Sequence, residues 1–179
     1  VFLSGFVLYE PAPSDLLLCL VVAIWAFAGL KLSRPMLPMI VLMLAYMAGG
    51  LLSFTQLDAF QKPAVYMAVT GFLVVSSIFF AAVIQVDTER RLQVIERSYV
   101  AAAIVCALIG ILAYFGQFPH AELFTLYDRA KGAFKDPNVF GPFLVPALLT
   151  ALHMWLTQPL RRGVLPLILV GVLSAGLLL

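Results

Sequence analysis

Long apolar stretches alternate with short polar ones along this chain. Each apolar stretch is close to the length of about twenty residues that a helix needs to cross the hydrocarbon of a bilayer. We therefore expect about five complete spans and a sixth that is unfinished at Leu179, with the apolar residues 1–9 continuing an earlier helix. The expected complete spans are Leu16–Leu32, Met36–Phe54, Ala64–Val86, Ser98–Phe115 and Asn138–Thr157.

The composition agrees with this pattern. The chain is 63% hydrophobic and only 11% charged, with a mean hydropathy of +1.05, whereas about a quarter of the residues of a soluble domain are charged. The expected fold class is all-α, a polytopic transmembrane helical bundle. Because Val1 is not methionine and the last apolar run is cut at Leu179, we expect residues 1–179 to be a single transmembrane region, the N-terminal fragment of a larger membrane domain.

The sequence offers few signals for a cofactor. Cys19 and Cys106 lie inside apolar runs, where free cysteine packs as a small hydrophobe. No zinc, haem or phosphate-loop spacing occurs, so we expect no metal and no cofactor. There is no signature of nucleic-acid binding either.

The positions of the cations predict the orientation. If the spans alternate, seven of the eleven lysines and arginines fall on one side, which the positive-inside rule makes cytoplasmic. These seven are Lys31, Arg34, Arg90, Arg91, Arg97, Arg161 and Arg162. The charged segment 87–97 is then a solvated amphipathic connector, and the loops around Asp58 and Arg129 face outward.

The outer loop, expected at residues 116–137, goes against this bias. Arg129, Lys131 and Lys135 crowd together just before an apolar stretch, which indicates a site for an anion. Alternatively, these cations balance the acidic residues of the loop or touch lipid headgroups. The acidic residues are Glu122, Asp128 and Asp136.

Asp136-Pro137-Asn138 has the form of a helix start, a capping acid followed by proline. Such a start is expected to leave free N–H groups and the positive end of the helix dipole pointing outward, which suits a phosphate or diphosphate. Arg129 is the best candidate ligand-binding residue, because its guanidinium can hold two phosphate oxygens. Gly132 either lets the backbone approach a ligand or serves a turn with positive φ.

Four apolar or cyclic side chains near this loop favour structural roles. Phe134 and Phe140 are expected to pack or to anchor the interface. Pro142 and Pro146 indicate a helix that faces protein rather than lipid, or one kinked only for packing.

The two histidines are not assigned to catalysis. His120 lies in the outer loop, but no residue is spaced to form a dyad with it. His153 lies near the cytoplasmic interface, which favours a structural role.

The pattern Arg129-x-x-Gly132-x-Phe134-x-x-Pro137-Asn138 resembles the signature of the O-antigen ligase and O-antigen polymerase family. The connection Tyr9–Asp15 and the spacing of the spans are similar to the N-terminal half of that family. The resemblance implies a metal-independent membrane glycosyltransferase of the bacterial inner membrane, active in lipopolysaccharide or exopolysaccharide synthesis. It would take a glycan from an undecaprenyl diphosphate carrier on the periplasmic face. The acceptor would be a lipid A core sugar or a second carrier-linked glycan.

The resemblance also assigns the site. Arg129 matches the motif arginine that family members use to hold the diphosphate. Family members have around twice as many spans, and their catalytic histidine lies in a later periplasmic loop. The catalytic residue is therefore expected beyond Leu179, and the fragment alone is expected to be inactive. The expected diphosphate-binding residues are Arg129, Lys131, Gly132, Lys135 and Asn138.

Two other functions remain open at this point. A transporter or permease fragment for a small anion would place polar or broken-helix features near the membrane midplane. A structural membrane subunit would have no site at all.

Overall fold

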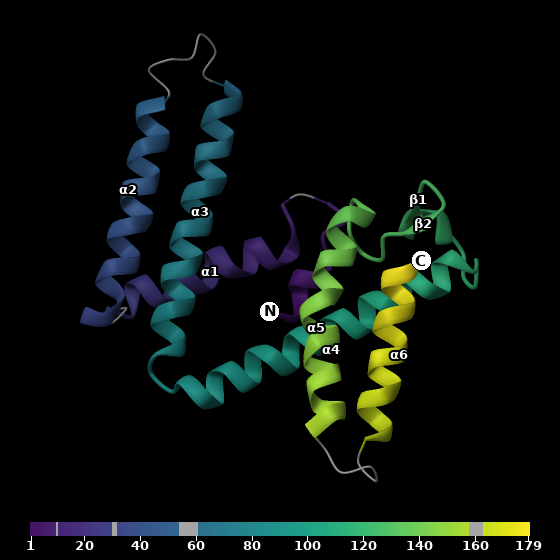
Figure 1. Ribbon diagram of the computed structural model, residues 1–179. Coiled ribbons are helices and arrows are strands. Elements are labelled where there is room, and N and C mark those ends of the chain that lie inside the picture. The colour runs from purple at the N-terminus through teal and green to yellow at the C-terminus, as the bar shows by residue number, and fades with distance from the viewer. Residues whose placement is uncertain (10, 30–31, 54–60, 158–162) are drawn as a thin grey trace. The chain divides into compact units, whose positions relative to one another are not determined.

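The computed structural model describes residues 1–9, 11–29, 32–53, 61–157 and 163–179. The chain is mostly helical (Figure 1), which confirms the prediction of an all-α fold. Among the described residues, four helical stretches are long and apolar enough to cross a membrane, so the chain is a membrane protein. The helices are α1 (Pro13–Phe27), α2 (Leu37–Ser53), α3 (Gln61–Ile84), α4 (Thr88–Tyr114), α5 (Pro137–Thr157) and α6 (Val164–Leu178).

The helix α1 has 15 residues and is shorter than the expected span Leu16–Leu32, and α6 also has 15 residues. A helix of that length measures about 22 Å, less than the roughly 30 Å of bilayer hydrocarbon. The first span was expected to reach Leu32, but α1 ends at Phe27 because Gly29 adopts a positive φ of 83°. A glycine in this conformation is a common helix terminator.

Helix α4 begins ten residues before the predicted start, at Thr88 rather than at Ser98. Residues 88–97 of the charged segment are therefore the mostly exposed beginning of the helix and not a separate connector. Its Glu, Arg, Leu and Gln residues are good helix formers, which is why the helix continues through them. The Arg91 side chain donates to the Val83 carbonyl near the end of α3 and so fixes the turn between the two helices.

Part of the charge pattern falls outside the described residues. This applies to Glu10, Lys31, Asp58, Arg161 and Arg162, and to the side chain of Lys62.

The chain divides into two compact units, residues 18–92 and residues 1–17 with 93–179. In the first unit, α2 and α3 pack through methionines that lie over glycines. A Cβ at Gly50 would stand 2.8 Å from the sulfur of Met67, and one at Gly71 would stand 3.4 Å from Met47 Cε. Gly50 thus allows α3 to approach closely, while Gly49 faces open space.

The second unit has its core where α4, α5 and α6 meet. Small residues on α4 let the other helices approach closely, a common packing mode of membrane helices. Cys106 is buried and its thiol donates to the Gly5 carbonyl at 3.0 Å, which confirms a packing role, whereas Cys19 is exposed. The core residues are Ala103, Cys106, Ala107, Ala130, Ala133, Phe134, Phe140, Leu144, Ala147, Ala151 and Leu173.

The prediction that residues 1–9 continue an earlier helix is wrong. They form a short 3-10 helix, η1 (Phe2–Gly5), followed by an extended stretch. The Val7 N–H donates to the Ala133 carbonyl at 2.7 Å, and Val7 forms a parallel bridge with Phe134. This segment therefore supports the loop that precedes α5.

Candidate functional site

The expected outer loop lies between Tyr114 and Pro137 and is an ordered structure. It contains a 3-10 helix, η4 (Ala121–Phe124), and a hairpin of two short strands, β1 (Thr125–Leu126) and β2 (Arg129–Ala130). Leu126 pairs with Arg129, so Arg129 is the first residue after the hairpin turn.

The turn residues are Tyr127 and Asp128, and both have positive φ, 53° and 57°. Two-residue hairpin turns of this kind favour Asn-Gly, because positive φ crowds the Cβ of other residues. An L-residue in this conformation costs about 1–2 kcal/mol. The hairpin therefore holds a strained turn directly beside Arg129.

Backbone hydrogen bonds fix the strand that carries Arg129. The Ala130 N–H donates to the Leu179 carbonyl at the end of α6 (3.0 Å), and the Lys131 N–H donates to the Phe124 carbonyl (2.9 Å). Arg129 is thus held from both η4 and α6 while its own side chain stays exposed.

Gly132 has a structural role in this arrangement. It is buried, its φ is 53°, and a Cβ there would stand 2.8 Å from Phe140 Cε2 and 3.0 Å from the Cys106 carbonyl oxygen. Of its two predicted roles, the structure supports the turn with positive φ, since a side chain and the α4 backbone occupy the space that a ligand would need. Phe134 and Phe140 are buried, as expected of packing residues.

The start of α5 confirms the capping prediction and corrects its consequence. The Asn138 N–H donates to Asp136 Oδ1 at 2.7 Å, as expected of a capping acid. The N–H groups of Val139 and Phe140 donate to the Asp136 carbonyl at 3.1 and 3.2 Å. Because Pro137 has no N–H, the first turn leaves no free backbone donor, and the prediction of outward-pointing N–H groups is wrong. Any anion here must be held by side chains.

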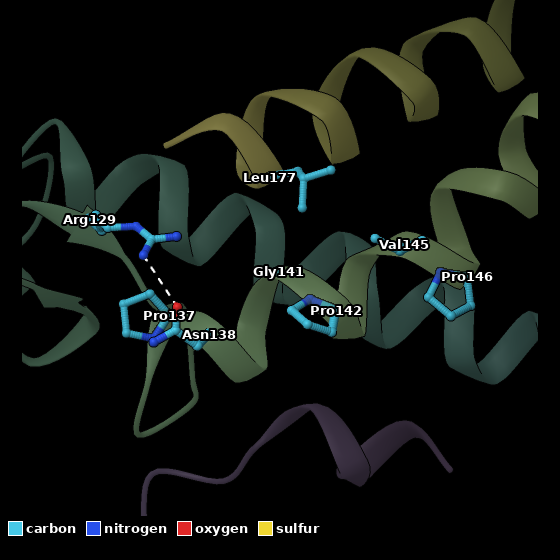
Figure 2. A pocket seen from close by; sticks show the side chains of 8 residues that line it. All are labelled: Arg129, Pro137, Asn138, Gly141, Pro142, Val145, Pro146 and Leu177. Carbon is cyan, nitrogen blue, oxygen red and sulfur yellow. Dashed lines mark hydrogen bonds between the residues drawn. The ribbon is translucent and has the colours of Figure 1, made fainter.

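A groove runs from this helix start along α5 and beneath the end of α6 (Figure 2). Its volume is about 530 Å³. Arg129 and Asn138 lie at one end, and the remaining lining is apolar. The lining residues are Arg129, Pro137, Asn138, Gly141, Pro142, Val145, Pro146 and Leu177.

The structure brings together two of the predicted binding residues. Arg129 Nη1 donates to Asn138 Oδ1 at 3.4 Å, a long bond that leaves the other guanidinium donors available (Figure 2). Lys131 is half-buried and Lys135 is exposed, and neither lines the groove. Gly132 lies in the core beneath Phe140.

The two internal prolines of α5, Pro142 and Pro146, line the groove. Each removes one helix donor, so the carbonyls of Asn138 and Pro142 lose their usual partners one turn later along the helix. Both residues line the groove. Both prolines are exposed, so the prediction that this side of the helix faces protein rather than lipid stays a prediction.

Sequence reasoning missed Gly141, Val145 and Leu177. Residues 138, 141, 142, 145 and 146 repeat at spacings of three and four, which places them on one helical face. That spacing could have revealed the α5 wall of the groove. No local signal points to Leu177, which comes from α6.

The histidines lie away from the groove lining. His120 Nδ1 stands 3.5 Å from Glu122 Oε1, and both side chains are exposed. His153 is exposed on α5. Within the described ranges, no three His, Cys, Asp or Glu side chains gather as metal ligands.

The geometry suits a ligand with an anionic head and an apolar body. The guanidinium of Arg129 supplies charge at one end, and hydrocarbon side chains supply the wall beyond it. No family model, curated protein or solved structure matches this chain. The chemistry of the groove is therefore the main guide to function.

Proposed function

We propose that this chain is the donor-binding part of a membrane glycosyltransferase that ligates or polymerises undecaprenyl-diphosphate-linked glycan, an O-antigen or an exopolysaccharide. The observation that carries the proposal is the groove with Arg129 at its polar end and an apolar wall along α5 and α6. The diphosphate would lie against Arg129, and the first isoprene units would lie along Pro142, Val145 and Leu177.

The head of the ligand accounts for most of the specificity. Arginine is suited to phosphate because its planar fork can donate two parallel hydrogen bonds. Asn138 holds one edge of that fork through its Oδ1 and keeps its own NH₂ donors for the ligand. Lys131 and Lys135 would contribute long-range positive potential rather than direct contacts.

The isoprenoid tail of the ligand would contribute more to its positioning than to its affinity. An isoprenoid in a bilayer is already in an apolar solvent, so moving it to an apolar groove gains little from the hydrophobic effect. The groove would instead align the lipid so that its diphosphate meets Arg129. The acceptor, a lipid A core sugar or a second carrier-linked glycan, and the catalytic residue are assigned to other parts of the full-length protein.

Binding of bare polyprenyl diphosphate to the protein in nanodiscs tests this proposal. Arg129→Ala should weaken binding about 10- to 100-fold, because hydrogen bonds to charged groups contribute about 1.5–3 kcal/mol. The affinity of Arg129→Lys should lie between those of the unaltered protein and of Arg129→Ala, since lysine keeps the charge but lacks the planar fork of donors. Asn138→Asp should also weaken binding, because a carboxylate would neutralise the guanidinium.

Arg97→Ala is the matched control, because Arg97 is an exposed cation on α4 outside the groove. Equal affinities for the unaltered protein, Arg129→Ala and Arg97→Ala would refute the proposed role. In cells, Arg129→Ala should abolish glycan transfer while membrane insertion is kept, and unchanged surface polysaccharide would count against the proposal.

The proposal includes a topology in the bacterial inner membrane. We propose that the loop 116–137 is periplasmic, that α1 completes a fifth crossing with its flanking residues, and that the start of α4 is cytoplasmic. A cysteine placed at the exposed Thr88 should react with a membrane-impermeant maleimide only after the membrane is opened. Labelling of that cysteine in intact spheroplasts would reverse the orientation.

An anion transporter is the alternative from another class. The helix α5 is continuous through its two internal prolines, and the charged lining residue of the groove lies at one end rather than midway. These observations favour the enzyme. Anion uptake into vesicles that is lost in Arg129→Ala would favour the transporter.

A further inference from the structure

The hairpin turn beside Arg129 carries two side chains that the fold does not require. Tyr127 is 86% exposed, so packing does not explain a bulky aromatic residue at a position with positive φ. Asp128 is also exposed and has positive φ. A turn of Asn and Gly would form the same hairpin without strain.

Backbone hydrogen bonds hold the turn in place. The strand that follows it is bonded to the end of α6 through Ala130 and to η4 through Lys131. Strained backbone that is held in place by its surroundings is often found at ligand sites. The support therefore fixes Tyr127 and Asp128, the two residues that directly precede Arg129 in the hairpin.

We propose that Tyr127 and Asp128 form a subsite for the first sugar of a ligand whose diphosphate lies on Arg129. This inference rests on the proposed function. In a glycosylated lipid diphosphate, the sugar and the hydrocarbon leave the diphosphate from opposite ends. With the hydrocarbon along α5, the sugar extends toward the turn.

The two side chains match the chemistry of a pyranose. The ring of Tyr127 offers a flat apolar face against which the C–H groups of a sugar can stack. The carboxylate of Asp128 accepts hydrogen bonds from hydroxyl groups, and bonds to a charged acceptor are stronger than neutral ones. The competing explanation is that Tyr127 anchors the loop among lipid headgroups, where tyrosine is enriched.

Two ligands separate these explanations, bare polyprenyl diphosphate and the same lipid carrying one hexose. Tyr127→Ala should weaken binding of the glycosylated lipid about tenfold and change binding of the bare lipid less than about twofold. Asp128→Asn should act in the same direction, and Tyr127→Phe should retain the preference. Tyr127→Asn removes the ring while suiting the turn, so it should repeat the Tyr127→Ala result in a stably folded protein.

Tyr9→Ala is the control, because Tyr9 is 78% exposed outside the hairpin. Equal weakening for both lipids in Tyr127→Ala and Tyr127→Asn would identify a membrane anchor and overturn the subsite. Unchanged binding of both lipids in these variants would overturn it as well. If Arg129→Ala binds both lipids as well as the unaltered protein does, the proposed function fails, and the sugar subsite fails with it.

Discussion

Gly132→Ala is expected to lower the free energy of unfolding by roughly 2–5 kcal/mol. A residue with a Cβ at a φ of 53° costs about 1–2 kcal/mol. The added methyl group would also stand 2.8 Å from Phe140 Cε2 and 3.0 Å from the Cys106 carbonyl, and overpacking of this kind costs about 1–3 kcal/mol. Denaturant titration in mixed micelles measures the change.

Gly116→Ala separates the two contributions. Gly116 has a similar φ of 63°, but a Cβ there meets nothing within 4 Å. It should therefore show only the backbone cost of about 1–2 kcal/mol. Equal losses at Gly116 and Gly132 would show that the contact with Phe140 and α4 contributes nothing.

Gly141→Leu is expected to block the groove while leaving Arg129 in place. Gly141 lines the groove, and a Cβ there would meet Leu177 Cδ1 at 3.4 Å, an ordinary contact. Alanine should fit, whereas the longer leucine should fill the space between α5 and α6. Binding of polyprenyl diphosphate should fall more than about tenfold, and binding of inorganic pyrophosphate should be unchanged.

Gly171→Leu is the control for this experiment, because a Cβ at Gly171 on α6 meets nothing within 4 Å. It adds the same side chain to a neighbouring helix outside the groove. If pyrophosphate binding falls in parallel with lipid binding in Gly141→Leu, then the groove and the head site are not separate and the tail assignment is wrong.

The hydropathy pattern predicted most helices because each is a continuous apolar run. The expected start of α2 and the expected start and end of α5 lie within one residue of those observed, while the expected end of the second span at Phe54 lies outside the described residues. The start of α4 was predicted wrongly because hydropathy excludes charged residues from a span, whereas residues 88–97 are charged and still helical. The end of α1 depends on the conformation of Gly29, which hydropathy does not report.

The candidate site was predicted less completely. Arg129 and Asn138 emerged from charge and from the motif, and the structure places them together. The hairpin escaped prediction because two-residue strands are too short to show alternation and Tyr127-Asp128 lacks the usual turn residues. The prediction of free N–H groups at the start of α5 failed because the side chain and the carbonyl of Asp136 accept their hydrogen bonds.

The hydrogen bond between Ala130 and Leu179 has a mechanical consequence. Leu177 lines the groove, and two residues later the Leu179 carbonyl accepts a hydrogen bond from the strand that carries Arg129. One backbone hydrogen bond thus joins the apolar wall to the strand that carries the guanidinium, so the backbone sets the distance between the head of the site and the start of its hydrocarbon wall.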